Sequence, residues 1–250
     1  MRLDAIEAYY DTVPRAAATT EEVGPFTLFL AQEGTGWQFY ARPRLGGEDR
    51  FTPHDVRRVL ARQRELGRPE AIEWVDDVTP SLLPAVRDAG LEAGSYPLLA
   101  LPAQTGAPAP EGARTLSPDS PDLPWVVGAV AAAFEGIDEV TERPVGRRRE
   151  LIAAGHLVEV AMYDAQGRVI GGGSAAPRGD TAELMGIGVP PSLRQKGAGT
   201  AITQALVHAC RTVGVETVFL SAYNDAAASI YRRVGFQDVG TACILGDDDE

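Results

Sequence analysis

The segment Arg194–Gly199 has the sequence R-Q-K-G-A-G, whose residue types could bind an anion. Pro190–Pro191 comes just before it and has no backbone N–H to give to a sheet, so the preceding strand must end there. An apolar helix pattern begins at Thr200, and a helix start offers unpaired N–H groups and a positive dipole end. Two glycines permit close approach of a ligand, and Arg194 and Lys196, the only lysine of the chain, add positive charge. This combination predicts a phosphate or pyrophosphate site.

Two other phosphate loops do not fit this segment. The chain has no G-x-x-x-x-G-K-[ST] sequence, and Ile202 occupies the place of the third glycine of the dinucleotide-binding fingerprint. Taken alone, the two glycines would fit a tight strand-to-helix turn equally well. The surrounding sequence therefore has to decide between a turn and a binding loop.

That surrounding sequence resembles the GNAT superfamily of N-acetyltransferases. The family signature [Q/R]-x-x-G-x-[G/A] matches Arg194–Gly199, and V-x-P stands just upstream. A second family motif is matched by N-D-A-A-A-S-I-Y-R-R-V-G-F at Asn224–Phe236. The resemblance covers about Arg114 to Leu245. It implies acetyl-CoA as donor, a small-molecule or peptide primary amine as acceptor, direct attack in a ternary complex, and no metal.

The resemblance also implies where the cofactor lies. The pyrophosphate would rest on the amides of Gln195–Thr200, and pantetheine would lie between the strand ending at Val189 and the strand Glu216–Ala222. The amide of Val189 would polarise the thioester carbonyl. The implied cofactor-binding residues are Ile187, Gly188, Val189, Arg194, Gln195, Lys196, Gly197, Ala198, Gly199, Thr200, Asn224 and Tyr231.

Acyl transfer to an amine needs a base for the amine and an acid for the departing thiolate. Tyr231 matches the usual acid of the family, although it could instead be a core aromatic residue; Asn224 could be a simple helix cap. Glu183 is the candidate base, because strand alternation would put positions 183, 185, 187 and 189 on one face. Glu183 could also be a solvated charge or bind substrate only, and some family members use water chains. His156 and His208 are weaker candidates.

The elements that would position these residues follow from periodicity and turn residues. Helices are predicted at Trp125–Phe134, Glu142–Ala154, Thr200–Val213 and Ala226–Val234, and strands at Leu157–Tyr163, Arg168–Ala176, Thr181–Val189, Glu216–Ala222 and Gln237–Leu245. The order is that of a mixed α/β domain with antiparallel strands first.

The first half looks like a degenerate copy of the second. The stretch Glu73–Leu91 resembles Phe219–Phe236, and Asp55–Gly67 resembles Ile202–Gly214. The first half has only R-P-R-L-G-G at Arg42–Gly47 in place of the signature, and it has Ala85 or Val86 where a tyrosine is expected. The alternative to an internal repeat is that one strand–helix–glycine unit recurs by chance.

We therefore expect an α/β (α+β) fold of two tandem GNAT-like domains, each a mixed, mostly antiparallel twisted sheet flanked by helices. The predicted boundaries are 1–101 for the degenerate domain, 102–113 for a Pro-rich linker and 114–250 for the acetyltransferase domain.

Composition bounds the remaining possibilities. The net charge of −12 argues against a nucleic-acid partner and mildly favours a cationic one. No apolar run is long enough to span a bilayer, and Cys210 and Cys243 cannot form a disulfide framework. We expect a cytoplasmic monomer or homodimer that does not act at a membrane. The alternative function is an inactive acyl-CoA-binding regulatory or scaffold protein.

Overall fold

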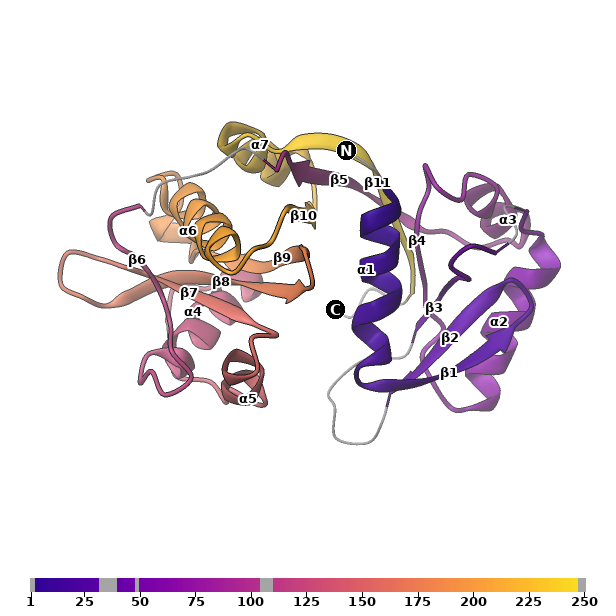
Figure 1. Cartoon of the computed structure of the whole chain (residues 1–250), viewed down its shortest axis with the longest axis horizontal. Coiled ribbons are helices and arrows are strands. Elements are labelled where there is room, and N and C mark those ends of the chain that lie inside the picture. Colours follow the sequence, from indigo (N-terminus) through magenta and orange to yellow (C-terminus); the bar gives the residue numbers. More distant parts are fainter. Residues whose placement is uncertain (1–2, 32–39, 48–49, 104–109, 247–250) are drawn as a thin grey trace. The chain divides into compact units, whose positions relative to one another are not determined.

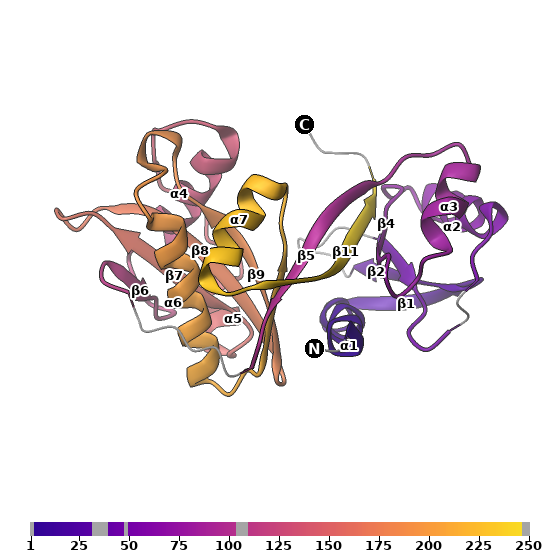
Figure 2. The ribbon, with the colours of Figure 1, turned by 90° about the horizontal axis from the view of Figure 1, so that it is seen from above.

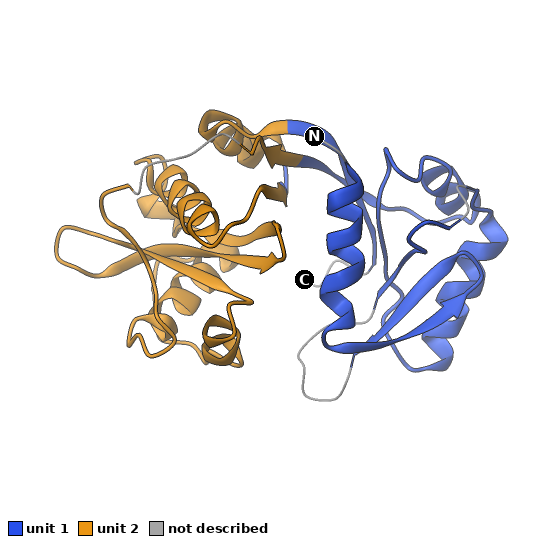
Figure 3. Cartoon of the chain, viewed as in Figure 1, with its two compact units in different colours: residues 1–98, 221–224, 238–250 blue, residues 99–220, 225–237 orange. Residues whose placement is uncertain are grey.

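The computed structural model describes residues 3–31, 40–47, 50–103 and 110–246. The chain forms two compact units (Figure 3). Unit 1 contains Met1–Leu98, Ser221–Asn224 and the chain from Asp238 onward, and unit 2 contains Leu99–Leu220 and Asp225–Gln237. The units depart from sequence order because strand β11 (Gln237–Leu245), which ends the second half of the chain, pairs with strand β4 (Ile72–Val75) of the first. The domain boundaries expected from the sequence stay a prediction.

Unit 1 is a sheet of antiparallel strands with one parallel pair (Figure 1). Its other elements are α1 (Leu3–Arg15), β1 (Ala18–Val23), β2 (Phe26–Ala31), β3 (Tyr40–Pro43), α2 (Pro53–Glu65), α3 (Leu82–Asp88) and the first part of β5 (Gly94–Leu101), whose residues from Leu99 onward belong to unit 2. Strands β1, β2 and β3 are successively antiparallel, β3 and β4 are parallel, and β4 and β11 are antiparallel. The core between the sheet and α2 and α3 includes Phe26, Leu28, Val56, Trp74 and Leu82, all essentially without exposed surface.

Unit 2 repeats this arrangement with more elements (Figure 2). They are β6 (Ala113–Thr115), α4 (Leu123–Glu135), α5 (Arg148–Ala153), β7 (Val158–Tyr163), β8 (Val169–Arg178), β9 (Thr181–Gly188), a 3-10 turn at Pro191–Leu193, α6 (Ala198–Thr212), β10 (Thr217–Ser221) and α7 (Asp225–Val234). Strands β6 to β9 are successively antiparallel, and β9 and β10 are parallel.

The predicted internal repeat is confirmed. In both units three antiparallel strands lead to a helix, a strand parallel to the last of the three, and a second helix. The glycines that end these helices also correspond: Gly67 and Gly214 follow the first helix, Gly90 and Gly235 the second, and all four have positive φ. The α/β (α+β) class expected from the sequence, with mixed, mostly antiparallel sheets flanked by helices, is therefore the observed one.

Two sequence-based expectations need correction. The helix predicted at Glu142–Ala154 is shorter, because Pro144 and Gly146, with φ of 52°, keep the chain before Arg148 out of helical geometry. The Pro-rich linker predicted at 102–113, of which 104–109 lie outside the described residues, ends inside β6 (Ala113–Thr115), whose three residues pair with β7. The other helices and strands predicted for the second half are confirmed, with ends shifted by one or two residues.

No helix in the described ranges is long and apolar enough to cross a membrane. Cys210 and Cys243 are buried and free. Burial raises the pKa of the Cys210 thiol to about 12, which keeps it protonated and unreactive.

Candidate active site

A β-bulge interrupts β9 near its end. Ser174 of β8 pairs with Met185, and Gly172 pairs with Gly188, so two residues of β9 oppose one residue of β8. Gly186 has φ of 59° and provides the left-handed conformation that such a bulge uses. The bulge shifts the alternation of side chains along β9 by one residue. It does so just before the loop that contains Arg194–Gly199, which is called the signature loop below.

The bulge overturns the expected face pattern. Glu183 and Met185 share a face with Gly188, over which α4 packs, since a Cβ on Gly188 would lie 3.0 Å from Ala133 Cβ. Ile187 and Val189 lie on the opposite face, toward α6, as their distances of 2.9 Å and 3.2 Å from Cβ positions built on Gly173 and Gly171 indicate. The expectation that positions 183, 185, 187 and 189 share one face is therefore wrong beyond Gly186. The role of Glu183 as base stays a prediction.

Three consecutive glycines of β8 let helices approach both faces of the sheet beside the bulge. A Cβ on Gly172 would lie 2.6 Å from Val126 of α4, whereas one on Gly171 would lie 2.8 Å from the Gly188 oxygen. Real Cβ atoms do not tolerate such distances, so any larger residue would force the helix or β9 away. These glycines position the loop after β9, and the sequence identified them only as part of a strand.

Strands β9 and β10 are paired only where they begin. Thr181 pairs with Thr217, and the pairing continues to Glu183 with Phe219. Among the described residues no further pair joins the two strands, although β9 runs to Gly188 and β10 to Ser221. The facing edges beyond this point keep backbone polar groups that an extended, amide-containing ligand could pair with.

The loop between β9 and α6 carries a row of unused backbone donors. Gln195 and Gly197 have φ of 63° and 86°, and alternating left-handed residues of this kind turn successive N–H groups toward one side. Gly197 is the N-cap of α6, and no side chain caps the helix. Within the described part of the chain, the N–H groups of Gln195–Thr200 donate to no acceptor, whereas Ala201 already donates to the Gly197 carbonyl. The loop therefore has the donors and the dipole that an anion needs.

Arg194 holds this loop in place. Its guanidinium donates to the carbonyl of Val189 at 2.9 Å and to that of Ala133, near the end of α4, at 2.7 Å. A cation at a helix C-terminus is favourable. Lys196 donates from Nζ to the Ser192 carbonyl at 3.2 Å and is otherwise exposed. Of the two expected cationic residues, Arg194 is thus already engaged by the protein's own backbone.

Tyr231 lies on α7, which packs on the start of α6: Ile230 is 4.0 Å from a Cβ built on Gly199. The Tyr231 ring is half-buried and packs edge-on against Phe236 at 6.1 Å. Its hydroxyl has no hydrogen-bond partner among the described residues. Burial raises the pKa of this phenol, so it stays protonated and able to donate.

The remaining candidates lie apart from this loop or are exposed. Asn224 is exposed, immediately before α7. His208 lies on the exposed face of α6, as expected, and His156 is exposed ahead of β7.

Comparison with known proteins agrees with this geometry. Residues 130–236 match the sequence model of the Acetyltransferase (GNAT) family. A mycothiol acetyltransferase of Renibacterium salmoninarum is 31% identical over 137 residues, which span 49% of this chain and 39% of that protein.

Solved structures show the same fold over the whole chain. A GCN5-related N-acetyltransferase from Kribbella flavida superposes with a TM-score of 0.75 at 21% identity, covering 99% of this chain and 96% of that one. One from Sphaerobacter thermophilus gives 0.59 at 15% identity, covering 98% and 85%. The signature loop, the bulged strand and the splayed parallel pair all lie within or beside the matched residues, so residues 130–236 form an acetyltransferase (GNAT) family domain.

Proposed function

We propose that unit 2 transfers an acetyl group from acetyl-CoA to a primary amine. The observation that carries this proposal is the row of unused N–H donors at Gln195–Thr200, next to a parallel strand pair that is open beyond Glu183. Both features suit one ligand with an anionic part and an extended amide part. Acetyl-CoA has a pyrophosphate and a pantetheine chain with these properties.

The residues present fit this cofactor. The amides of Gln195–Thr200 would hold the pyrophosphate, and Gly197 and Gly199 leave the backbone uncovered. Arg194 would hold the loop in its conformation through its two hydrogen bonds to carbonyl groups. Lys196, which is part of the loop, would add positive charge near the pyrophosphate. Ile187, Gly188 and Val189 would border pantetheine on one side.

Bound acetyl-CoA supplies an activated acetyl thioester. The amine nitrogen forms a bond to the carbonyl carbon, the carbon–sulfur bond breaks, and the amine loses a proton while the thiolate gains one. The amide of Val189 is the proposed donor to the thioester oxygen, where negative charge develops during attack. Ala198, the first residue of α6, and Thr200 complete the cradle that fixes the donor's position.

Tyr231 is the proposed acid for the thiolate. Its hydroxyl is free to donate, and its raised pKa keeps the proton in place at neutral pH. A thiolate with a pKa of about 8.5 accepts a proton readily at that pH.

Glu183 is the proposed base. It is half-buried on β9, on the face toward α4, at the last paired position before β9 and β10 part. Glu183→Gln keeps the side-chain shape and should lower kcat about a hundredfold at neutral pH while acetyl-CoA affinity stays within about twofold. An unchanged rate would remove Glu183 from proton transfer and leave deprotonation to water.

The experiment that tests this function has two parts. Calorimetry should detect binding of acetyl-CoA to the full chain, and a thiol assay should detect release of free CoA with members of a panel of primary amines. Absence of binding would contradict the proposal. Binding without CoA release across the panel would favour an inactive acyl-CoA-binding regulatory protein instead.

A further inference from the structure

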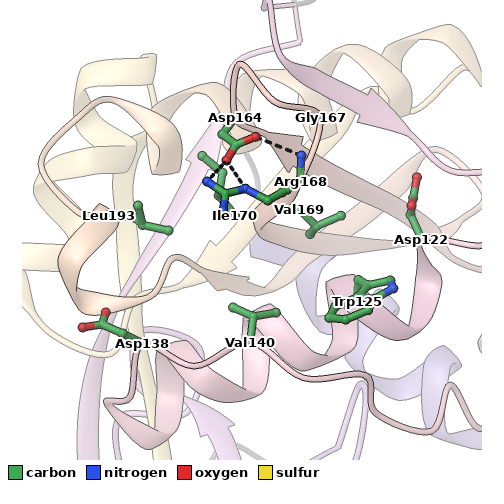
Figure 4. A pocket seen from close by; sticks show the side chains of 10 residues that line it. All are labelled: Asp122, Trp125, Asp138, Val140, Asp164, Gly167, Arg168, Val169, Ile170 and Leu193. Carbon is green, nitrogen blue, oxygen red and sulfur yellow. Dashed lines mark hydrogen bonds and ion pairs between the residues drawn. The ribbon is translucent and has the colours of Figure 1, made fainter.

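A pocket of about 460 Å³ lies in unit 2 beside the signature loop (Figure 4). It lies between α4, the chain that follows α4 and the turn joining β7 to β8. Its lining residues are Asp122, Trp125, Asp138, Val140, Asp164, Gly167, Arg168, Val169, Ile170 and Leu193. All of them belong to unit 2, and nothing in the mechanism above uses the pocket.

The charges around the pocket leave it negative. Arg168 is paired with Asp164 at 2.7 Å, so these two charges offset each other. The Ser192 N–H lies 2.7 Å from Asp138 Oδ1 and lowers the pKa of that carboxyl, which therefore stays ionised. Asp122 accepts a hydrogen bond from the Tyr163 hydroxyl at 2.7 Å. Neither Asp122 nor Asp138 forms an ion pair within the described residues.

Two arginines lie near these carboxylates without neutralising them by contact. Arg194 also favours the ionised form of Asp138, but its guanidinium donates to the carbonyls of Val189 and Ala133. Arg114 lies over the Tyr163 ring, 4.9 Å from its centre, and not on Asp122. Two carboxylates therefore face the pocket without a cation of their own.

The rest of the wall is apolar and includes an exposed indole. Trp125 is 39% exposed on α4, whose residues Leu123, Val126, Ala129 and Ala132 are buried. Val140, Val169 and Leu193 continue this surface, as Figure 4 shows. An indole face attracts ammonium groups, and an apolar wall takes a hydrocarbon chain. The combination suits an organic cation better than a metal ion or an anion.

The pocket is joined to the cofactor loop. Asp138 holds the Ser192 amide, and Leu193 precedes Arg194 directly. The chain carrying Asp138 and Val140 runs back against α4 because Gly128 has no side chain: a Cβ there would collide with the Thr141 carbonyl oxygen. A ligand in the pocket would thus contact the segment that leads into the proposed pyrophosphate site.

We propose that this pocket binds a second ammonium group of the acceptor, so that the preferred substrates are diamines or larger polyamines with an apolar spacer. The proposal rests on the acetyl transfer proposed above. Asp138 and Asp122 lie at opposite ends of the pocket (Figure 4). In a diamine, one ammonium group would lie against Asp138, beside Ser192, and the other amine, deprotonated, would attack the thioester. In a longer polyamine, a further ammonium group would reach Asp122 and the Trp125 ring.

The test compares cadaverine with pentylamine, which has the same hydrocarbon chain and a single amine. With the wild-type chain, kcat/KM for cadaverine should exceed that for pentylamine by about tenfold or more. Asp122→Asn and Asp138→Asn keep an oxygen that can accept the Tyr163 and Ser192 hydrogen bonds while removing the charge. The double variant should lose this preference, so that the ratio of kcat/KM for cadaverine to kcat/KM for pentylamine falls to about one. Asp119→Asn, an exposed position outside the pocket, is the matched control and should change neither.

A binding measurement separates this proposal from the proposed function. Calorimetry of cadaverine, with and without CoA, should give binding that the double variant weakens about tenfold and Asp119→Asn does not. Equal cadaverine affinity for the wild type and the double variant would overturn the pocket proposal, whether or not any amine is acetylated. Carboxylate-dependent cadaverine binding with no CoA release from any amine would support the pocket and contradict the acetyl transfer.

Discussion

The helices α2 and α6 occupy corresponding places in the two units but begin in opposite ways. The start of α2 is closed by its own residues: the Asp55 N–H donates to Thr52 Oγ1, and the Thr52 N–H donates to the Asp55 carboxylate at 3.0 Å. This capping box places a negative charge where an external anion would lie. The start of α6 has a glycine N-cap and no acidic residue in its first turn. The same fold therefore gives a helix start closed by its own residues in one unit and a helix start with unused N–H donors in the other.

The parallel strand pair of each unit, β3–β4 in unit 1 and β9–β10 in unit 2, also differs in the side-chain contacts that join its strands. In unit 1 the buried Arg42 of β3 contacts Glu73 of β4 at 3.5 Å and Glu7 of α1 at 3.4 Å, and its guanidinium lies 4.3 Å from the centre of the Tyr10 ring. These contacts tie β3, β4 and α1 together. In unit 2 the corresponding strands part after Glu183. Among the described residues β3 and β4 pair only at Ala41 and Ile72, so the difference between the two strand pairs is that the side chains of Arg42 and Glu73 join β3 to β4. We infer that in unit 1 the start of α2 is closed to an external anion.

The largest expected effect comes from Gly197→Asp at the start of α6. A side chain is strained at φ of 86°, and its carboxylate would face the pyrophosphate. Acetyl-CoA affinity should fall at least about a hundredfold, roughly 2.7 kcal/mol. Gly214→Asp, at φ of 85° at the other end of α6, carries the same backbone strain without a phosphate nearby. Calorimetry should find near-normal affinity in that control; equal losses in both variants would assign the effect to strain.

Tyr231→Phe should lower kcat about a hundredfold with little change in acetyl-CoA affinity, because the ring keeps its packing on Phe236 and only the proton donor is lost. Tyr40→Phe in unit 1 is the control and should leave the rate unchanged. Steady-state kinetics with a good amine acceptor measure both, and a normal kcat for Tyr231→Phe would exclude Tyr231 as the acid.

The pH dependence sharpens this assignment. Burial raises the pKa of Tyr231 above the ordinary phenol value of about 10, so its protonated form persists to higher pH than that of an exposed tyrosine. The alkaline side of the kcat profile should therefore stay flat up to about pH 10. A decline starting near pH 8 would indicate a different acid.

A smaller effect is expected when α6 is given the cap of α2. Thr200 occupies the third helical position, which Asp55 occupies in α2. Thr200→Asp should weaken acetyl-CoA binding about tenfold and leave the thermal stability equal or slightly higher, because a carboxylate is favourable in the first turn of a helix. Thr200→Val is the size-matched control. If Thr200→Asp bound acetyl-CoA as well as Thr200→Val does, the free helix start would not be the anion site.

The smallest effect on function is expected from Asp55→Ala. Loss of the capping box should lower the free energy of unfolding by about 1 kcal/mol in urea titrations. Acetyl-CoA affinity and kcat should not change, because unit 1 has no part in cofactor binding in this account. A weakened affinity would mean that unit 1 contributes to the site.

The sequence could predict what depends on local patterns. Glycines, prolines and apolar periodicity located the strands and helices of unit 2, and the spacing of Gly197 and Gly199 located the loop. It could not predict the bulge at Gly186, since one inserted residue leaves no mark in a glycine-containing strand, and the expected common face of Glu183 and Val189 was wrong for that reason.

Long-range contacts were also beyond the sequence patterns. The contacts of Arg194 with Ala133, of Asp138 with Ser192, and of β11 with β4 join segments far apart in the chain. The same is true of Arg42, whose partners come from two other elements. The sequence shows which residues are charged and which are apolar, but it does not show which charged residues contact each other.

The stoichiometry of acetyl-CoA binding tests the difference between the two units most directly. Calorimetric titration of the full chain should give one acetyl-CoA per chain, with binding lost in Gly197→Asp and retained in Asp55→Ala. Two acetyl-CoA molecules per chain, or one whose affinity depends on Asp55 and not on Gly197, would contradict the assignment of the site to the start of α6.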